Sequence, residues 1–121
     1  MKIPKELVCD IAPGCHLKAG FVIYPSIKLL RIAFGSKIID GDVEAFCACK
    51  GGGKNEKIIT LHFYRRKMSH DIIAHEVFHA VAELIRVLHL NLEDQYAQEL
   101  CAHAVSHLMK KAALAKKLIK K

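Results

Sequence analysis

The residues best suited to chemistry form an H-E-x-x-H motif in the second half of the chain, His75-Glu76-Val77-Phe78-His79. Four residues are about one helical turn, so in a helix both imidazoles project from one face and can bind the same metal ion. Zinc suits such ligands, and it lowers the pKa of a bound water molecule to about 7. Glu76 lies close enough around the helix to take a proton from that water as a general base. The motif therefore predicts a zinc-dependent hydrolytic centre with Glu76 as its catalytic residue.

A catalytic zinc ion needs a third protein ligand and an open fourth position. The longer form H-E-x-x-H-x-x-G-x-x-H is absent, because position 82 is Ala and position 85 is Ile. Glu99 is the expected third ligand, since it stands among apolar residues where an unpaired charge is costly and a metal ion is a sufficient partner. An antiparallel second helix would bring it back over the motif. The alternatives that stay open are His103, Glu93 and Asp94, with Glu83 better placed beside the site than on the metal.

The motif belongs to a predicted helix with Ser69 as its N-cap. Apolar residues recur in it at helical spacing, namely Ile73, Val77, Val81, Leu84 and Leu88. Val77 and Phe78 are expected to face the core. Asn91 is expected to cap a second helix, in which the apolar period continues toward the C-terminus through Tyr96, Leu100, Ala104 and Leu108.

The first half of the chain predicts strands. Lys57–Tyr64 is the clearest of them, because it is rich in β-branched and aromatic residues. Phe21–Tyr24 and Val43–Cys49 predict two more, whereas Ser26–Phe34 suits a helix or a strand. A turn is expected at 40–42 and a flexible hairpin connection at 51–55. Residues 1–20 are broken by Pro and Gly, so an irregular segment with one short element around Lys5–Ile11 is expected.

Strands followed by two substantial helices predict an α+β fold. In this arrangement a short antiparallel or mixed sheet precedes the H-E-x-x-H helix, and a second long helix carries the third ligand. The 121 residues suit one domain over 1–121. With 52% hydrophobic and 26% charged residues, a disordered chain is excluded.

No apolar stretch reaches the roughly 20 residues of a membrane helix, and the N-terminus lacks the apolar core of a secretory signal. A soluble, cytoplasmic protein with no membrane partner is therefore expected. The five cysteines are an odd number, which argues against a disulfide framework and for reduced, buried thiols.

The formal net charge is +7, and most of the excess lies in residues 110–121, which hold six lysines and no acid. This basic tail is predicted to be helical. Its lysines are interpreted as a solvated face. A nucleic-acid contact is the alternative, although no aromatic residue is interleaved to stack on bases.

Two segments resemble a known family, the small phage- and prophage-encoded zinc metallopeptidases that form a minimal gluzincin. That family carries H-E-[VAI]-x-H-A and, after a short loop, a helix reading roughly D-E-x-x-A-Y-L-[IV]-G-x-L. Here 75–80 follows the first pattern and 98–108 follows the second, with Glu99 on the family's Glu and Ala102 on its small residue. The order of predicted elements is also similar over residues 21–109.

The resemblance implies a zincin-like domain that binds one zinc ion through His75, His79 and Glu99 and cleaves a peptide or other amide bond. It implies Glu76 as the general base. It also implies that Lys57–Tyr64 is an edge strand, along which an extended peptide or protein substrate pairs by main-chain hydrogen bonds.

Larger gluzincins place an Asp four residues after the ligand Glu to orient a ligand histidine; here that position is His103. The residue that stabilises the oxyanion is left open among four candidates. They are His62, Tyr64, Tyr96 and His103, of which His62, Tyr96 and His103 are also candidates for orienting the site.

Other functions compete with this reading. A non-catalytic zinc protein would use the same ligands to hold its helices together or to recognise a partner, and it would not need Glu76. A nucleic-acid-binding protein would depend on residues 110–121. A peptide-deformylase-like enzyme also uses H-E-x-x-H, with a Cys ligand, but Glu44–Cys47 matches its ligand strand poorly.

Overall fold

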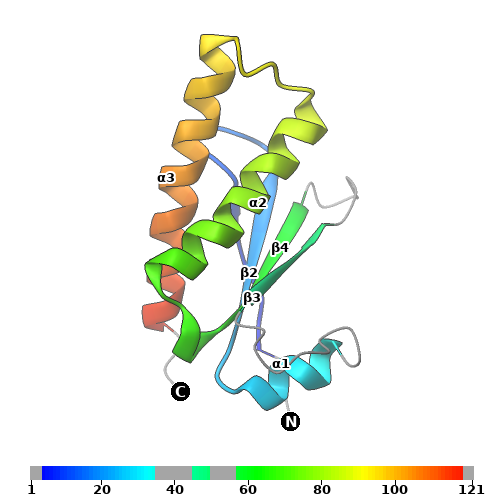
Figure 1. The fold of residues 1–121 in the computed structure, drawn as a ribbon, viewed down its shortest axis with the longest axis vertical. Coiled ribbons are helices and arrows are strands. Elements are labelled where there is room, and N and C mark those ends of the chain that lie inside the picture. The colour runs from blue at the N-terminus through cyan, green and yellow to red at the C-terminus, as the bar shows by residue number, and fades with distance from the viewer. Residues whose placement is uncertain (1–3, 35–44, 50–56, 119–121) are drawn as a thin grey trace.

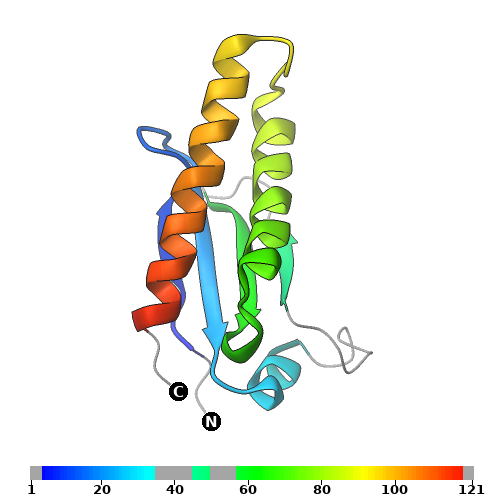
Figure 2. The same cartoon turned by 60° about the vertical axis from the view of Figure 1, so that its left-hand side comes forward.

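The computed structural model describes residues 4–34, 45–49 and 57–118. In chain order the elements are β1 (Leu7–Asp10), β2 (Lys18–Tyr24), α1 (Ile27–Phe34), β3 (Ala45–Cys49), β4 (Lys57–Tyr64), the short 3-10 turn η2 (Arg65–Lys67), α2 (His70–Leu88) and α3 (Gln95–Leu118). Helices α2 and α3 form a long antiparallel hairpin on one face of the sheet, and α1 lies at one end of the molecule (Figures 1 and 2). The predicted α+β class is confirmed.

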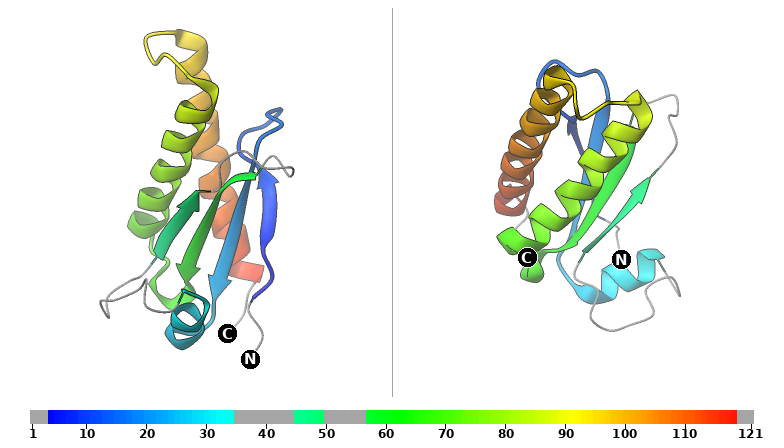
Figure 3. Two further views of the ribbon diagram at one scale, coloured as in Figure 1. Left: turned by 90° about the vertical axis from the view of Figure 1, so that its right-hand side faces the viewer. Right: turned by 45° about the horizontal axis from the view of Figure 1, so that its top comes forward.

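The four strands form one mixed sheet in the order β1-β2-β4-β3. Strand β1 is antiparallel to β2, β2 is parallel to β4, and β3 is antiparallel to β4. Strand β4 therefore lies inside the sheet, and the expectation that Lys57–Tyr64 is an edge strand was wrong. The burial of the strand agrees with this position: Ile58 to Phe63 are all buried, as in a strand that is covered on both faces and paired on both edges. The edges of this sheet are β1 and β3 (Figure 3).

The N-terminal segment is more ordered than its Pro and Gly content predicts. The short element expected around Lys5–Ile11 is strand β1, and β2 begins at Lys18 rather than Phe21. The Glu6 carboxylate, just before β1, accepts hydrogen bonds from Lys57 Nζ at 2.8 Å and from Thr60 Oγ1 at 3.0 Å. It reaches them across Gly20, where a Cβ atom would overlap the carboxylate.

The segment between β2 and β4 contains one helix, α1, and one strand, β3, among its described residues. The segment for which helix and strand were left open forms α1, and Ser26 Oγ accepts a hydrogen bond from the Leu29 N–H at 3.2 Å. Strand β3 is described from Ala45 onward. The expected turn at 40–42 and the connection at 51–55 lie outside the described residues.

The N-cap of α2 is confirmed and that of α3 is corrected. Ser69 Oγ accepts a hydrogen bond from the Ile72 N–H at 3.2 Å, as predicted for the cap of α2. Helix α3, however, begins at Gln95, and the preceding Asp94 accepts from the Tyr96 N–H. Asn91 instead accepts from the Glu93 N–H and closes a turn of the connection between the helices.

The main core lies between the sheet and the α2–α3 hairpin. It includes Leu61 and Phe63 of β4, Val77 and Leu84 of α2, and Leu108 of α3. A second, smaller cluster on the other face joins α1 to the sheet through Val22, Tyr24 and Leu30.

Two predicted core positions were wrong, because Phe78 is 69% exposed and Tyr96 is 87% exposed. Successive residues of a helix are about 100° apart. The buried stripes centred on Val77 in α2 and on Ala97 and Ala104 in α3 therefore turn these two rings toward solvent.

No helix in the described ranges combines the length and the apolar character needed to cross a bilayer. The three cysteines whose side chains are described, Cys9, Cys15 and Cys101, are free thiols.

Candidate metal centre

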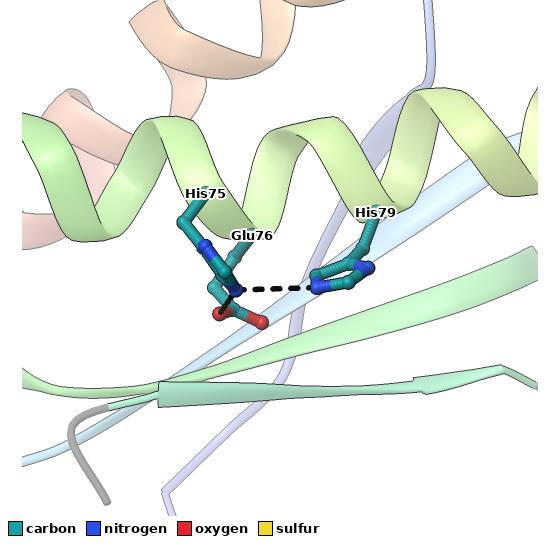
Figure 4. A group of neighbouring side chains, drawn as sticks. All are labelled: His75, Glu76 and His79. Carbon is teal, nitrogen blue, oxygen red and sulfur yellow. Dashed lines mark hydrogen bonds and ion pairs between the residues drawn. The ribbon is translucent and has the colours of Figure 1, made fainter.

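The H-E-x-x-H motif occupies the second and third turns of α2. The N-terminus of this helix is stabilised, because Ser69 caps the first turn and Asp71 places a negative charge near the positive end of the helix dipole. The apolar side chains of α2 pack on the sheet and on α3, which fixes the rotation of the helix. Figure 4 shows the consequence: His75, Glu76 and His79 all project from α2 toward strands β3 and β4.

The two histidines are spaced as ligands of one zinc ion. Their Nε2 atoms are 3.3 Å apart, and the rings meet edge to face with centroids 4.9 Å apart. Two nitrogens that each bind a tetrahedral zinc ion at about 2.05 Å stand about 3.3 Å apart. The side chain of His75 is 68% exposed, so an ion can reach the pair from solvent.

Glu76 is the buried member of the group. Its Oε2 lies 3.8 Å from His75 Nε2, and its Oε1 has no hydrogen-bond partner among the described residues. Burial raises the pKa of the carboxyl, and the two nearby histidines oppose this increase in part. A buried carboxylate oxygen without a partner is costly. The donor set and this unpaired oxygen fit a site completed by a metal ion and its water.

Within the described part of the chain, these three residues are the group whose ligand atoms all lie within 4.8 Å of one another. Glu83 is not a member, although it is buried one turn beyond His79. Arg86 donates to both of its oxygens, with Nη2 3.1 Å from Oε2, so its charge is neutralised within α2. Glu83 is therefore engaged by Arg86 and stands outside the His75-Glu76-His79 group.

The structure does not bring Glu99 to the two histidines. Its side chain is 65% exposed, and its Oε2 lies 3.7 Å from His103 Nε2. The buried stripe of α3 explains this position, because Glu99 is about 200° around the helix from Ala97 and so faces away from the packed side. The other candidates, Glu93 and Asp94, are exposed in the connection between the helices and are also outside the group.

The candidates for the oxyanion-stabilising residue lie elsewhere. Leu61 and Phe63 face the helices, so His62 between them faces the opposite side of the sheet. There its Nδ1 is 3.1 Å from Tyr24 Oη, and burial lowers the pKa of His62 to about 4. Tyr64 packs against the cluster on that same face.

The remaining two candidates, Tyr96 and His103, are exposed on α3 and do not belong to the metal-binding group. None of the four candidates therefore touches the site in this structure.

Two features of the site were missed by sequence reasoning. Phe78 is exposed with its ring centroid 6.4 Å from that of His79, which offers an apolar contact beside the histidines. Its angle around the helix could have revealed this, since it is about 100° from the buried Val77. The second feature is strand β3, an edge strand against which α2 also packs. The order of strands in space has no comparably direct signal in a single sequence.

Comparison of the chain with family models, curated proteins and solved structures gave no match. The class that the fold and the site define is therefore an α+β protein with a His-Glu-His group on one helix.

Proposed function

We propose that this protein is a zinc-dependent hydrolase of the zincin type, acting as a metallopeptidase. The observation that carries the proposal is the 3.3 Å separation of the His75 and His79 Nε2 atoms above a buried Glu76 with an unpaired oxygen. Surface histidines on a helix would not need a buried carboxylate beside them. A hydrolytic zinc site needs one to accept a proton.

In this proposal, His75 and His79 hold the zinc ion through Nε2. When bound, the ion supplies a Lewis acid and lowers the pKa of water. Glu99 stays the proposed third ligand, on the strength of its sequence context. Because it faces solvent beside His103, its joining the site requires the first turns of α3 to reorient when metal binds.

Glu76 is the proposed general base. Its raised pKa makes it a better proton acceptor than an exposed carboxylate, and its unpaired Oε1 is available to a water molecule. Glu76 takes a proton from that water, whose oxygen forms a bond to the carbonyl carbon of the substrate. The same carboxyl then donates the proton to the departing amine as the C–N bond breaks.

The proposed substrate is an extended peptide that pairs with an edge strand, and the strand is β3 instead of β4. Strand β3 is at the end of the sheet next to α2, and one of its edges pairs with β4. Main-chain pairing on its other edge would lay a peptide beside the His-Glu-His group. Phe78 would then contact an apolar side chain of that peptide.

A non-catalytic zinc protein is the second candidate function. Beyond His75, Glu76 and His79, no described residue brings a ligand atom to the group, so the third ligand expected of a catalytic zinc centre is not in place. The two functions differ in their need for Glu76.

The test is the zinc content of protein purified without chelator, measured together with hydrolysis of a fluorogenic peptide mixture. Wild type should carry about one zinc ion, and His79→Ala should lose it. Glu76→Gln should keep the ion and lose hydrolysis by about 100-fold or more. Loss of zinc in Glu99→Gln but not in His103→Gln would support the proposed third ligand.

Zinc retention with equal activity of wild type and Glu76→Gln would contradict the enzyme and support the non-catalytic protein. If wild type contains no zinc and gains none on titration, both functions fail.

A further inference from the structure

Basic residues from two distant segments gather at one end of the molecule. Turn η2 supplies Arg65, Arg66 and Lys67, and the last turns of α3 supply Lys116 and Lys117. Figures 1 and 2 show the end of α3 beside the start of α2. The two segments are tied together, because Lys116 Nζ donates to the Met68 carbonyl oxygen at 2.8 Å.

Two adjoining pockets open on this surface. The first, of about 420 Å³, is lined by the apolar side chains of Met68, Ile73 and Ala113 and by Arg65, Ser69, His70, Lys116 and Lys117. The second is lined by residues that include Arg66, Lys67, Ser69, Asp71 and Lys116, and the two pockets share Met68, Ser69 and Lys116. Asp71 is the one acid that lines either of them among the described residues. We call these two pockets together the basic end.

Charge is segregated along the long axis of the molecule. The far end of the helical hairpin carries Glu93 and Asp94, with Glu99 in the first turns of α3, whereas the basic end carries five Arg and Lys residues. A lysine face that only keeps a helix in contact with solvent does not require a second basic segment beside it. The convergence of two basic segments raises the local positive potential, which attracts polyanions.

The lining also limits the kind of polyanion. Arginine, lysine and a hydroxyl group suit phosphate oxygens, and two adjoining pockets suit successive phosphates of one chain. His70 is the one aromatic ring that lines either pocket among the described residues, so a platform for stacking successive bases is not provided. We propose that the basic end binds the phosphate backbone of nucleic acid without reading its sequence. The inference does not depend on the proposed hydrolase activity.

The test uses the full chain, kept metal-free with chelator, and a fluorescein-labelled DNA duplex of about 20 base pairs, followed by fluorescence anisotropy. With about four phosphate contacts, the dissociation constant should rise roughly 100-fold between about 50 and 200 mM salt. A salt-independent dissociation constant, or no binding at the lowest salt, would overturn the proposal.

Matched double variants separate a defined surface from net charge. Arg66→Gln/Lys117→Gln removes two exposed charges from the basic end, and Lys5→Gln/Lys28→Gln removes two exposed charges from the segment before β1 and from α1. The first should weaken binding about tenfold and reduce the salt slope by about 2, and the second should change affinity less than about twofold. Equal weakening by both would contradict a localised site.

An acidic protein surface is the competing partner. If polyglutamate displaces the labelled duplex as effectively as unlabelled DNA at equal charge, the nucleic-acid assignment is overturned. Unchanged circular dichroism and melting temperature of the variants confirm that the differences in binding do not come from unfolding.

Discussion

At the scale of single residues, two buried titratable groups lie on opposite faces of the sheet and have opposite consequences. Glu76 is buried on the helix side with an unpaired oxygen, which a bound metal and its water would satisfy. His62 is buried on the other side and already has a partner in Tyr24. Glu76 is therefore suited to the proposed proton transfer, whereas His62 is suited to a structural role whose contribution to stability depends on pH.

Stability is expected to fall in mild acid because of His62. Its pKa is lowered from 6.5 to about 4 by burial, so the unfolded chain binds a proton below pH 6.5 that the folded protein does not accept until about pH 4. Stability from this group is thus present above the ordinary pKa and is lost as the pH falls toward 4. Between about pH 6.5 and 5 the loss should reach about 2 kcal/mol.

Urea unfolding of wild type and His62→Gln at both pH values, with chelator present, measures this contribution. The amide can keep a hydrogen bond to Tyr24 but does not titrate in this range. The variant should therefore lose about 2 kcal/mol less than wild type on acidification. The same loss in both proteins would assign the acid sensitivity to other groups.

At the scale of elements, the contact of Glu6 with β2 and β4 depends on a missing side chain. Gly20→Ala would place a methyl group where the Glu6 carboxylate lies, and the flexible Glu6 side chain would move away. Its hydrogen bonds to Lys57 and Thr60 would be lost. The expected loss of unfolding free energy is about 1–2 kcal/mol.

A double-mutant cycle tests that mechanism by chemical denaturation. In a Glu6→Ala background the methyl group meets no carboxylate, so Gly20→Ala should cost almost nothing. A full cost in that background would mean that the strand backbone, not Glu6, is what the substitution disturbs.

The elements themselves could largely be predicted from the sequence, because each depends on local signals. The N-cap residue Ser69 and the helical spacing of the apolar residues predicted α2. The β-branched run 57–64 predicted β4 with the bounds that the structure shows. The position of β4 inside the sheet could not be predicted, because strand order is decided by contacts between distant segments.

The third ligand shows the same limit at the site. Within one helix, the spacing of His75, Glu76 and His79 fixed their geometry. The rotation of α3 depends on which of its residues pack on the core. Ala104 and Leu108 of the predicted stripe are buried, but at the start of the helix Ala97 is buried and Tyr96 is exposed.

At the scale of the whole molecule, the structure separates two surfaces. The His-Glu-His group lies on the side of α2 that faces β3 and β4, and the basic end lies at the junction of η2 and the end of α3 (Figures 1 and 4). Metal binding and polyanion binding should consequently be independent. Loss of one in a variant should leave the other intact.

Zinc binding should stabilise the whole domain, because an ion that binds only the folded chain shifts the unfolding equilibrium by mass action. At a free zinc concentration of about 100 times Kd the gain is about 2.7 kcal/mol. For a chain of 121 residues this corresponds to a rise in Tm of about 10 °C. Differential scanning fluorimetry of chelator-treated protein, with and without added zinc, measures the shift.

Three variants test whether the rise in Tm comes from zinc bound at the histidines of α2. His79→Ala should show almost no shift, because one ring of the 3.3 Å pair is gone. Glu76→Gln should keep the shift, since its proposed role is to move a proton and not to bind the ion. The Arg66→Gln/Lys117→Gln variant should also keep it, because the basic end is a separate surface. A shift of equal size in His79→Ala would assign the zinc effect to other groups, such as the free thiols, and would remove the metal centre from α2.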